Sequence, residues 1–163
     1  MRWRYHDLVD DTRVVSWQLG RPARPFLRVA VRCAHGFPAV TEQAPYDADG
    51  EPFPTTFYLT CPWLVAGIAR VEAGGGVERY SRAAREDAAL GESLARADAE
   101  QRELRPELPV GIAGTKDREN LKCLHAHAAF ALARPGYELG ERVLDEAGER
   151  WCPDRRCERA VAG

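Results

Sequence analysis

Most cysteine and histidine side chains of this 163-residue chain lie in three short stretches. These are Cys33-Ala-His35-Gly36, Cys61-Pro62 and Lys122-Cys123-Leu-His125-Ala-His127, which hold three of the five cysteines and three of the four histidines. Cysteine and histidine bind zinc-like metals, and near neutral pH they act as nucleophiles, acids and bases. We therefore predict that the fold gathers these stretches into one site of chemistry.

The spacing of these residues restricts which of them can act together. Cys33 and His35 are two apart, so on a strand their side chains share a face. Cys123 and His127 are four apart and share a face of a helix, whereas His125 lies about 200° of rotation from Cys123. This favours Cys123 and His127 as joint ligands, unless the helix begins late and leaves Cys123 in an irregular first turn.

Tetrahedral zinc is the metal that such ligands favour. Cys61 precedes Pro62 at an expected helix start, where the helix dipole favours the thiolate that binds metal. We predict a zinc site with three cysteine ligands and one histidine ligand: Cys33, Cys61 and Cys123 with His127 or His125, and His35 as an alternate. The remaining histidine or Lys122 would move protons. Without a CxxC or HExxH spacing, a metal-free thiol pocket and plain core packing remain alternatives.

A second pattern suggests an anion site. The loop from Gly111 to Gly114 leads into an expected helix start at Thr115, and free amide groups there can hold a phosphate or carboxylate. Lys116 and Lys122 are the chain's lysines among many arginines, which suggests a compact charge for such a ligand. We predict an anion-binding edge formed by Gly111, Gly114 and Lys116, and the alternative is an ordinary helix entry.

The elements that must position these residues follow from local patterns. A helix over 11–19 is followed by strands over 26–33, 37–41 and 55–60, with a turn at Gly36. From Pro62 the apolar period becomes helical. It predicts a helix that ends at Gly74, two polar-surfaced helices separated by an Asp87 cap, and a buried helix over 117–134; a further short helix lies within 136–148.

These elements predict an α+β fold. A small antiparallel sheet from about residue 26 to 60 packs against a layer of four to five helices, in a single domain that spans residues 1–163. The tail over 150–163 carries Cys152 and Cys157. These two cysteines form half of a metal site, or the tail is a mobile segment.

Composition narrows the classes of function. Apolar residues make up 45% of the chain and charged residues 29%, and the formal net charge of −2 argues against a nucleic-acid or acidic-membrane binder. No apolar run approaches the roughly 20 residues that span a bilayer, and no signal-peptide pattern opens the sequence. We expect a cytoplasmic protein with reduced cysteines.

Several segments, in this order, resemble the bacterial family DUF501, a domain of unknown function. The resemblance extends from about residue 11 to 134 and rests on Gln18–Arg21, Val29–Cys33, Gln43–Pro45, Asp49–Thr55, Tyr58–Pro62 and Leu121–His127. It implies a small cytoplasmic bacterial protein without an established activity. It also implies that Cys33 and the run Lys122–His125 belong to the family pattern, and that cysteine or histidine occupies the position of Cys61.

Two functions from different classes follow. The first is a zinc enzyme that hydrolyses a small polar substrate, since bound zinc lowers the pKa of water to about 7. The second is a non-catalytic interaction or structural module with a closed zinc site or a metal-free thiol pocket. The sequence names no partner, and another protein or a small anionic ligand is compatible with either function.

Overall fold

The sheet has the three predicted strands. The computed structural model describes residues 5–116 and 120–162. Its strands β1 (Arg28–Arg32), β2 (Pro38–Glu42) and β3 (Phe57–Leu59) pair antiparallel in the order β1-β2-β3. Gly36, at φ 89°, makes the turn between β1 and β2, a conformation in which glycine is not strained. Val40 of the central strand pairs with Val31 on one side and Leu59 on the other.

Six α-helices in the described residues complete the predicted α+β class. They are α1 (Tyr5–Leu19), α2 (Pro62–Ala73), α3 (Gly76–Glu86), α4 (Ala88–Leu104), α5 (Leu124–Ala133) and α6 (Glu138–Glu146). Pro62 begins α2, and the Asp87 side chain accepts hydrogen bonds from the amides of Ala89 and Leu90 at the start of α4. No helix in this part of the chain is both long and apolar enough to cross a membrane.

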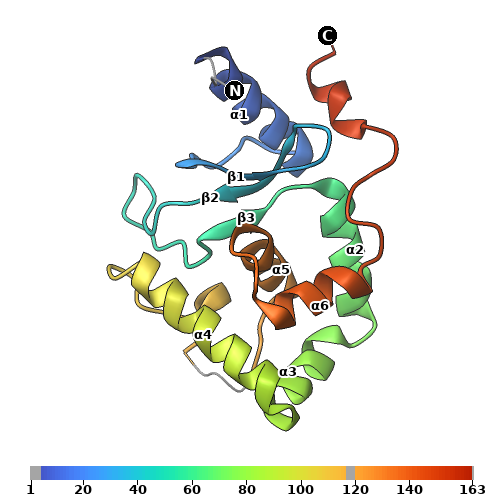
Figure 1. The fold of residues 1–163 in the computed structure, drawn as a ribbon. Coiled ribbons are helices and arrows are strands. Elements are labelled where there is room, and N and C mark those ends of the chain that lie inside the picture. Colours follow the sequence, from blue (N-terminus) through green and yellow to red (C-terminus); the bar gives the residue numbers. More distant parts are fainter. Residues whose placement is uncertain (1–4, 117–119, 163) are drawn as a thin grey trace.

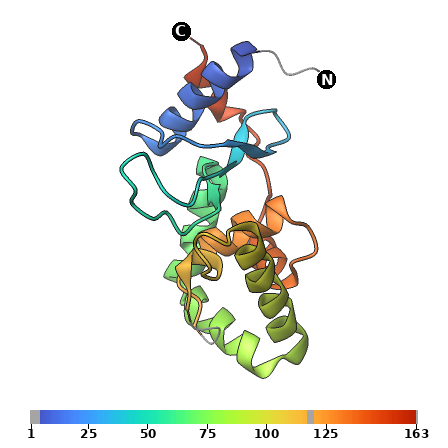
Figure 2. The same ribbon diagram turned by 90° about the vertical axis from the view of Figure 1, so that its left-hand side faces the viewer.

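The sheet separates α1 from the other helices. Figure 1 shows α5 beneath β3, with α2 and α6 beside it, and Figure 2 shows α1 on the opposite side of the sheet next to the C-terminal segment. The buried α5 is the predicted central helix, and its Phe130 ring meets Phe57 of β3 edge-on at 5.6 Å between centroids. The main core therefore lies between the sheet and α5.

The start of α5 differs from the prediction. The helix expected from residue 117 begins at Leu124; residues 117–119 lie outside the described residues, and Asn120 to Cys123 are not helical. The amides of Leu121 and Leu124 donate to Ser81 Oγ (3.0 Å) and Glu72 Oε2 (2.9 Å) instead of to a preceding turn. Contacts with α2 and α3 thus override the local helix pattern, and Cys123 becomes the extended N-cap.

The C-terminal tail packs against α1. A 3-10 turn, η2 (Arg156–Ala160), lies beside α1 in Figure 2, and Cys157 and Ala160 form a second small core with Val14 and the half-buried Phe37. This cluster joins the last residues of the chain to the first helix.

Candidate metal centre

Three potential ligands meet where α2 ends and α5 begins. Glu72, Cys123 and His125 each offer one ligand atom, and these atoms lie within 4.8 Å of one another. His125 Nδ1 lies 3.8 Å from Cys123 Sγ and 3.2 Å from Glu72 Oε1. The late start of α5 creates this group, because an extended Cys123 reaches the side chain two residues ahead. The alternative left open by the sequence, pairing of Cys123 with His125, is therefore the one found.

Neighbouring backbone groups fix the orientation of two ligands. His125 Nε2 lies 3.1 Å from the Val65 carbonyl oxygen, which can only accept, so Nε2 carries the proton. Nδ1 of the neutral ring is then an unprotonated lone pair that faces Cys123 and Glu72. The Leu124 amide holds the other oxygen of Glu72, Oε2, at 2.9 Å. Such second contacts are typical of histidine and carboxylate ligands of metals.

The spacing of the ligand atoms suits a tetrahedral ion. With zinc bonds of ~2.0–2.3 Å, neighbouring sulfur and nitrogen ligands lie ~3.6 Å apart and nitrogen and oxygen ligands ~3.3 Å apart. The distances from His125 Nδ1, 3.8 and 3.2 Å, agree with these edges to about 0.2 Å. Three protein ligands leave one tetrahedral position for water or a substrate, which is the composition of catalytic zinc sites.

The electrostatics of the site favour charged forms of two residues. Burial alone would raise the pKa of Cys123, but the hydrogen bond with His125 and the backbone at Ala126 outweigh it, so the net shift is downward. The pKa of His125 is raised, chiefly by Cys123, against the opposing effect of burial. The site thus stabilises a thiolate and needs a positive group between the thiolate and the carboxylate, either a proton on His125 or a metal ion.

Cys123 and His125 line a pocket of about 550 Å³ between α2, β3 and the end of α1. Its walls are largely small and apolar, with Ala66, Ala69 and Ala126 among them. Two buried polar atoms of its lining, Thr60 Oγ1 and Gln18 Oε1, have no hydrogen-bond partner in the described part of the chain. They are available to a polar ligand, because buried polar atoms normally carry a partner.

The remaining predicted ligands lie in two other places. Cys33, His35 and Cys61 line a small cavity with the tail residues Cys152 and Cys157, not the pocket of Cys123. Cys61 is at the predicted N-cap of α2, but burial raises the pKa of its thiol to about 11, against the lowering effect of the Leu64 and Trp63 amides. The expectation that the helix start makes Cys61 a thiolate is therefore wrong for the free thiol, because desolvation outweighs the dipole.

His127 points into the core. Its side chain is fully buried, and the Tyr137 hydroxyl lies 2.7 Å from its Nδ1. Burial lowers the pKa of His127 to about 4, so the ring is neutral at physiological pH. His127 faces α6, and the group around Cys123 does not include it.

The predicted anion loop has a different structure from the one expected. Gly111 precedes a short 3-10 turn and no α-helix start, and the Ile112 amide donates to Asp98 Oδ1 at 2.9 Å. The protein's own carboxylate therefore occupies the loop. Gly114 lies against Pro54, and Lys116 is exposed. The Lys122 ammonium donates to the Gly114 carbonyl at 3.4 Å, and none of these residues lines the pocket beside Cys123.

The sequence analysis did not identify Glu72 as a candidate ligand. One signal was available, since Glu72 lies in the last turn of α2, where a negative charge opposes the helix dipole and needs a partner elsewhere. It also lies seven residues after Val65, so both face the same side of the helix. The sequence did not reveal that the start of α5 packs against this side of α2.

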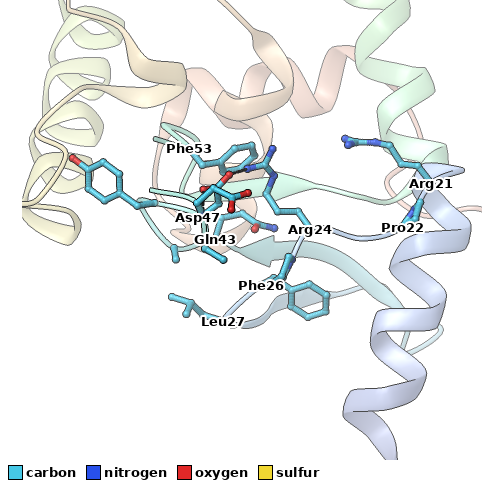
Figure 3. A pocket seen from close by; sticks show the side chains of 13 residues that line it. Arg21, Pro22, Arg24, Phe26, Leu27, Gln43, Asp47 and Phe53 are labelled. Carbon is cyan, nitrogen blue, oxygen red and sulfur yellow. Dashed lines mark hydrogen bonds and ion pairs between the residues drawn. The ribbon is translucent and has the colours of Figure 1, made fainter. Parts of the chain in front are cut away.

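Another pocket, of about 470 Å³, lies at the start of β1 and contains no cysteine or histidine (Figure 3). Arg24 lies between Asp47, at 3.4 Å, and the Phe53 ring, at 4.6 Å from the centroid, so its charge is already paired. Arg21 extends apart from them and donates to the Tyr58 hydroxyl at 3.4 Å. This pocket offers a binding surface, and its lining holds none of the predicted cysteine or histidine ligands.

The fold and the site define a small α+β protein with a cysteine–histidine–glutamate group that could hold a metal. The chain belongs to the family described as Protein of unknown function (DUF501), whose model matches residues 29–110, half of the chain. This confirms the resemblance seen in the sequence. The matched part contains the sheet, α2 with Val65 and Glu72, and α3 and α4, and it ends before Cys123. Neither the curated proteins nor the solved structures include a match.

Proposed function

We propose that Glu72, Cys123 and His125 hold a zinc ion and that the protein hydrolyses a small polar substrate in the adjoining pocket. One observation carries the proposal. Three ligand atoms, His125 Nδ1, Glu72 Oε1 and Cys123 Sγ, lie within 4.8 Å of one another, at distances from Nδ1 that suit a tetrahedral ion. When bound, zinc would supply a Lewis acid and a water of pKa about 7.

The chain's own residues would divide the other tasks. The Val65 carbonyl and the Leu124 amide hold His125 and Glu72 in ligating orientation. Gln18 and Thr60 offer buried polar atoms to the polar part of a substrate, and the small alanine side chains leave room for it. Because His125 is a ligand in this proposal, it does not move protons, and Lys122 lies outside the pocket lining.

The size of the pocket favours an enzyme over the closed structural module. A closed four-ligand site needs no adjoining space, whereas substrate pockets are typically ~300–1,000 Å³. The pocket of about 550 Å³ lies within this range. In the reducing cytoplasm expected from the sequence, Cys123 would remain a free thiol able to bind metal.

Metal analysis of the tag-free protein tests the proposal. Cys123→Ser, His125→Ala and Glu72→Gln should each lower the zinc content by up to one equivalent, whereas Glu78→Gln, an exposed carboxylate of α3, should leave it unchanged. The rate of hydrolysis of 4-nitrophenyl acetate or 4-nitrophenyl phosphate should rise with pH, with an apparent pKa near 7. The proposal fails if the three site variants hold as much zinc as the wild type.

A metal-free thiol enzyme is the second candidate, favoured by the opposite pKa shifts of Cys123 and His125. A thiolate beside an imidazolium is the activated pair of cysteine nucleophiles. Iodoacetamide then labels Cys123 quickly at pH 7, with or without a chelator. Under the zinc proposal the bound metal protects Cys123, and EDTA speeds the labelling.

A further inference from the structure

Four of the five cysteines surround one small cavity. Cys33 follows β1, Cys61 caps α2, and Cys152 and Cys157 belong to the C-terminal tail, yet all four line the same space of about 10 Å³. This volume is close to the size of a single water molecule or ion. None of the four forms a disulfide, and Cys61, Cys152 and Cys157 are buried.

The tail that brings two of these cysteines is held in place by side chains around the cavity. His35 Nε2 donates to the Cys152 carbonyl at 2.7 Å, and Gln18 Nε2 lies 3.4 Å from Cys157 Sγ. The Arg156 guanidinium stacks over the Trp63 ring at 5.0 Å from its centroid. Residues of α1, of the turn after β1 and of α2 therefore all contact the tail near the four thiols. Most of these contacts do not depend on the sulfur atoms.

We propose that Cys33, Cys61, Cys152 and Cys157 form a second, structural zinc site that ties the C-terminal tail to β1 and α2. Four thiolates without an open position are typical of structural zinc, and the four residues between Cys152 and Cys157 match a usual spacing of its ligands. The small closed cavity contrasts with the pocket beside Cys123. This site is independent of the proposed catalytic centre, since the two share no ligand.

Modest side-chain movements would complete the site. Among the described residues only Glu72, Cys123 and His125 bring three ligand atoms within 4.8 Å, so the four sulfurs must approach one another when the ion binds. A turn of one cysteine between staggered rotamers moves its sulfur by roughly 3 Å, which requires no backbone shift.

The charge around the cavity suits a tetrathiolate. Binding of Zn²⁺ by four thiols releases four protons and leaves a complex with two negative charges. Arg155 and Arg156 line the same cavity, and although they already pair with Glu158 and Asp154, they keep positive groups near these charges. Arg155 also lies 3.4 Å from His35 Nδ1, so its guanidinium contacts a histidine that lines the cavity.

X-ray absorption on the zinc-loaded full chain tests the proposal without removing any of the four cysteines. The double variant Cys123→Ser/His125→Ala is used, so that the proposed catalytic centre cannot contribute. We expect about one equivalent of zinc with four sulfur neighbours at ~2.3 Å. Less than a tenth of an equivalent, or a shell with fewer than three sulfurs, overturns the proposal.

Point variants provide the complementary test. Adding Cys157→Ser to the double variant gives a triple variant, which should bind no zinc. Chelation should lower the melting temperature of the double variant but not that of the triple variant. Ser93→Ala, a buried polar residue of α4 whose hydroxyl accepts from the Glu138 amide, is the matched control and should retain the zinc. Retention of a full equivalent by Cys33→Ser, Cys61→Ser and Cys157→Ser alike would also refute the site. If Cys123→Ser, His125→Ala and Glu72→Gln all keep the zinc content of the wild type while Cys157→Ser loses one equivalent, the catalytic centre is refuted and this site stands.

Discussion

Two histidines of α5, only two residues apart, have opposite environments. His125 lies at the surface of a pocket beside a thiol and a carboxylate, and its pKa is raised. His127 is buried against Tyr137 and its pKa is lowered to about 4. The sequence contains both in one motif. Helix geometry alone favoured His127 beside Cys123, but the structure has His125 there, because the start of the helix depends on tertiary hydrogen bonds.

The buried neutral His127 predicts a loss of stability in mild acid. In the unfolded chain a histidine titrates near 6.5, so protons bind the unfolded state first as the pH falls from 6.5 toward 4. Between pH 7 and 4.5 this should lower the free energy of unfolding by on the order of 2 kcal/mol. The full contribution is present above pH 6.5.

Urea unfolding of the wild type and of His127→Asn at several pH values measures this effect. Asparagine keeps an acceptor near the position of Nδ1 but does not titrate, so its stability should fall less steeply over the same range. A matching control is His35→Asn, which removes the half-buried histidine near the tail. Equal pH slopes for the wild type and His127→Asn would contradict a depressed pKa.

At the scale of elements, α6 approaches α5 closely at Gly140. A Cβ atom added there would lie 2.6 Å from the His127 carbonyl oxygen and 2.7 Å from Ala131 Cβ, both on the well-packed α5. Glycine at this position therefore permits the close crossing of the two helices, which bury His127 and Tyr137 between them.

Gly140→Ala should destabilise the protein by roughly 1–3 kcal/mol, because the helices must separate or shift. The control is Gly74→Ala at the end of α2, where φ is −84° and the nearest atom would lie at an ordinary 3.5 Å. That change should be neutral or stabilising by up to about 1 kcal/mol. Thermal unfolding of both variants decides the matter, and equal melting temperatures would contradict the close packing at Gly140.

The elements predicted correctly are those that local chemistry determines. Pro62 begins α2, Asp87 caps α4 and Gly36 turns the first hairpin, and each acts through its own backbone conformation or a nearby amide. The start of α5 could not be predicted in this way, because Glu72 and Ser81 hold its first amides from other helices. The group of Glu72, Cys123 and His125 depends on that start. The sequence therefore identified Cys123 and His125 as candidates, but it did not identify Glu72 and did not show that Cys61 lies in another cavity.

At the scale of the whole molecule, the two ends of the chain stabilise one face of the sheet. Arg32 of β1 forms two hydrogen bonds with the buried Asp11 of α1, at 2.7 and 2.9 Å. Gln18 donates to the Pro38 carbonyl, and η2 packs on Val14. The other five helices pack among themselves and on the opposite face, as Figures 1 and 2 show.

This division predicts that deletion of residues 152–163 loosens α1 and leaves the α5–α6 region folded. Val14 would lose its contacts with Cys157 and Ala160, and exposure of one valine costs on the order of 1.5–3 kcal/mol. Amide protection in α1, measured by hydrogen exchange, should therefore fall at least ten-fold, with little change in α5 and α6. EDTA in all samples restricts the comparison to packing, and Arg159→Ala, an exposed change in η2, should leave α1 protected. If the shortened chain keeps the α1 protection of the full chain, the tail does not stabilise that helix.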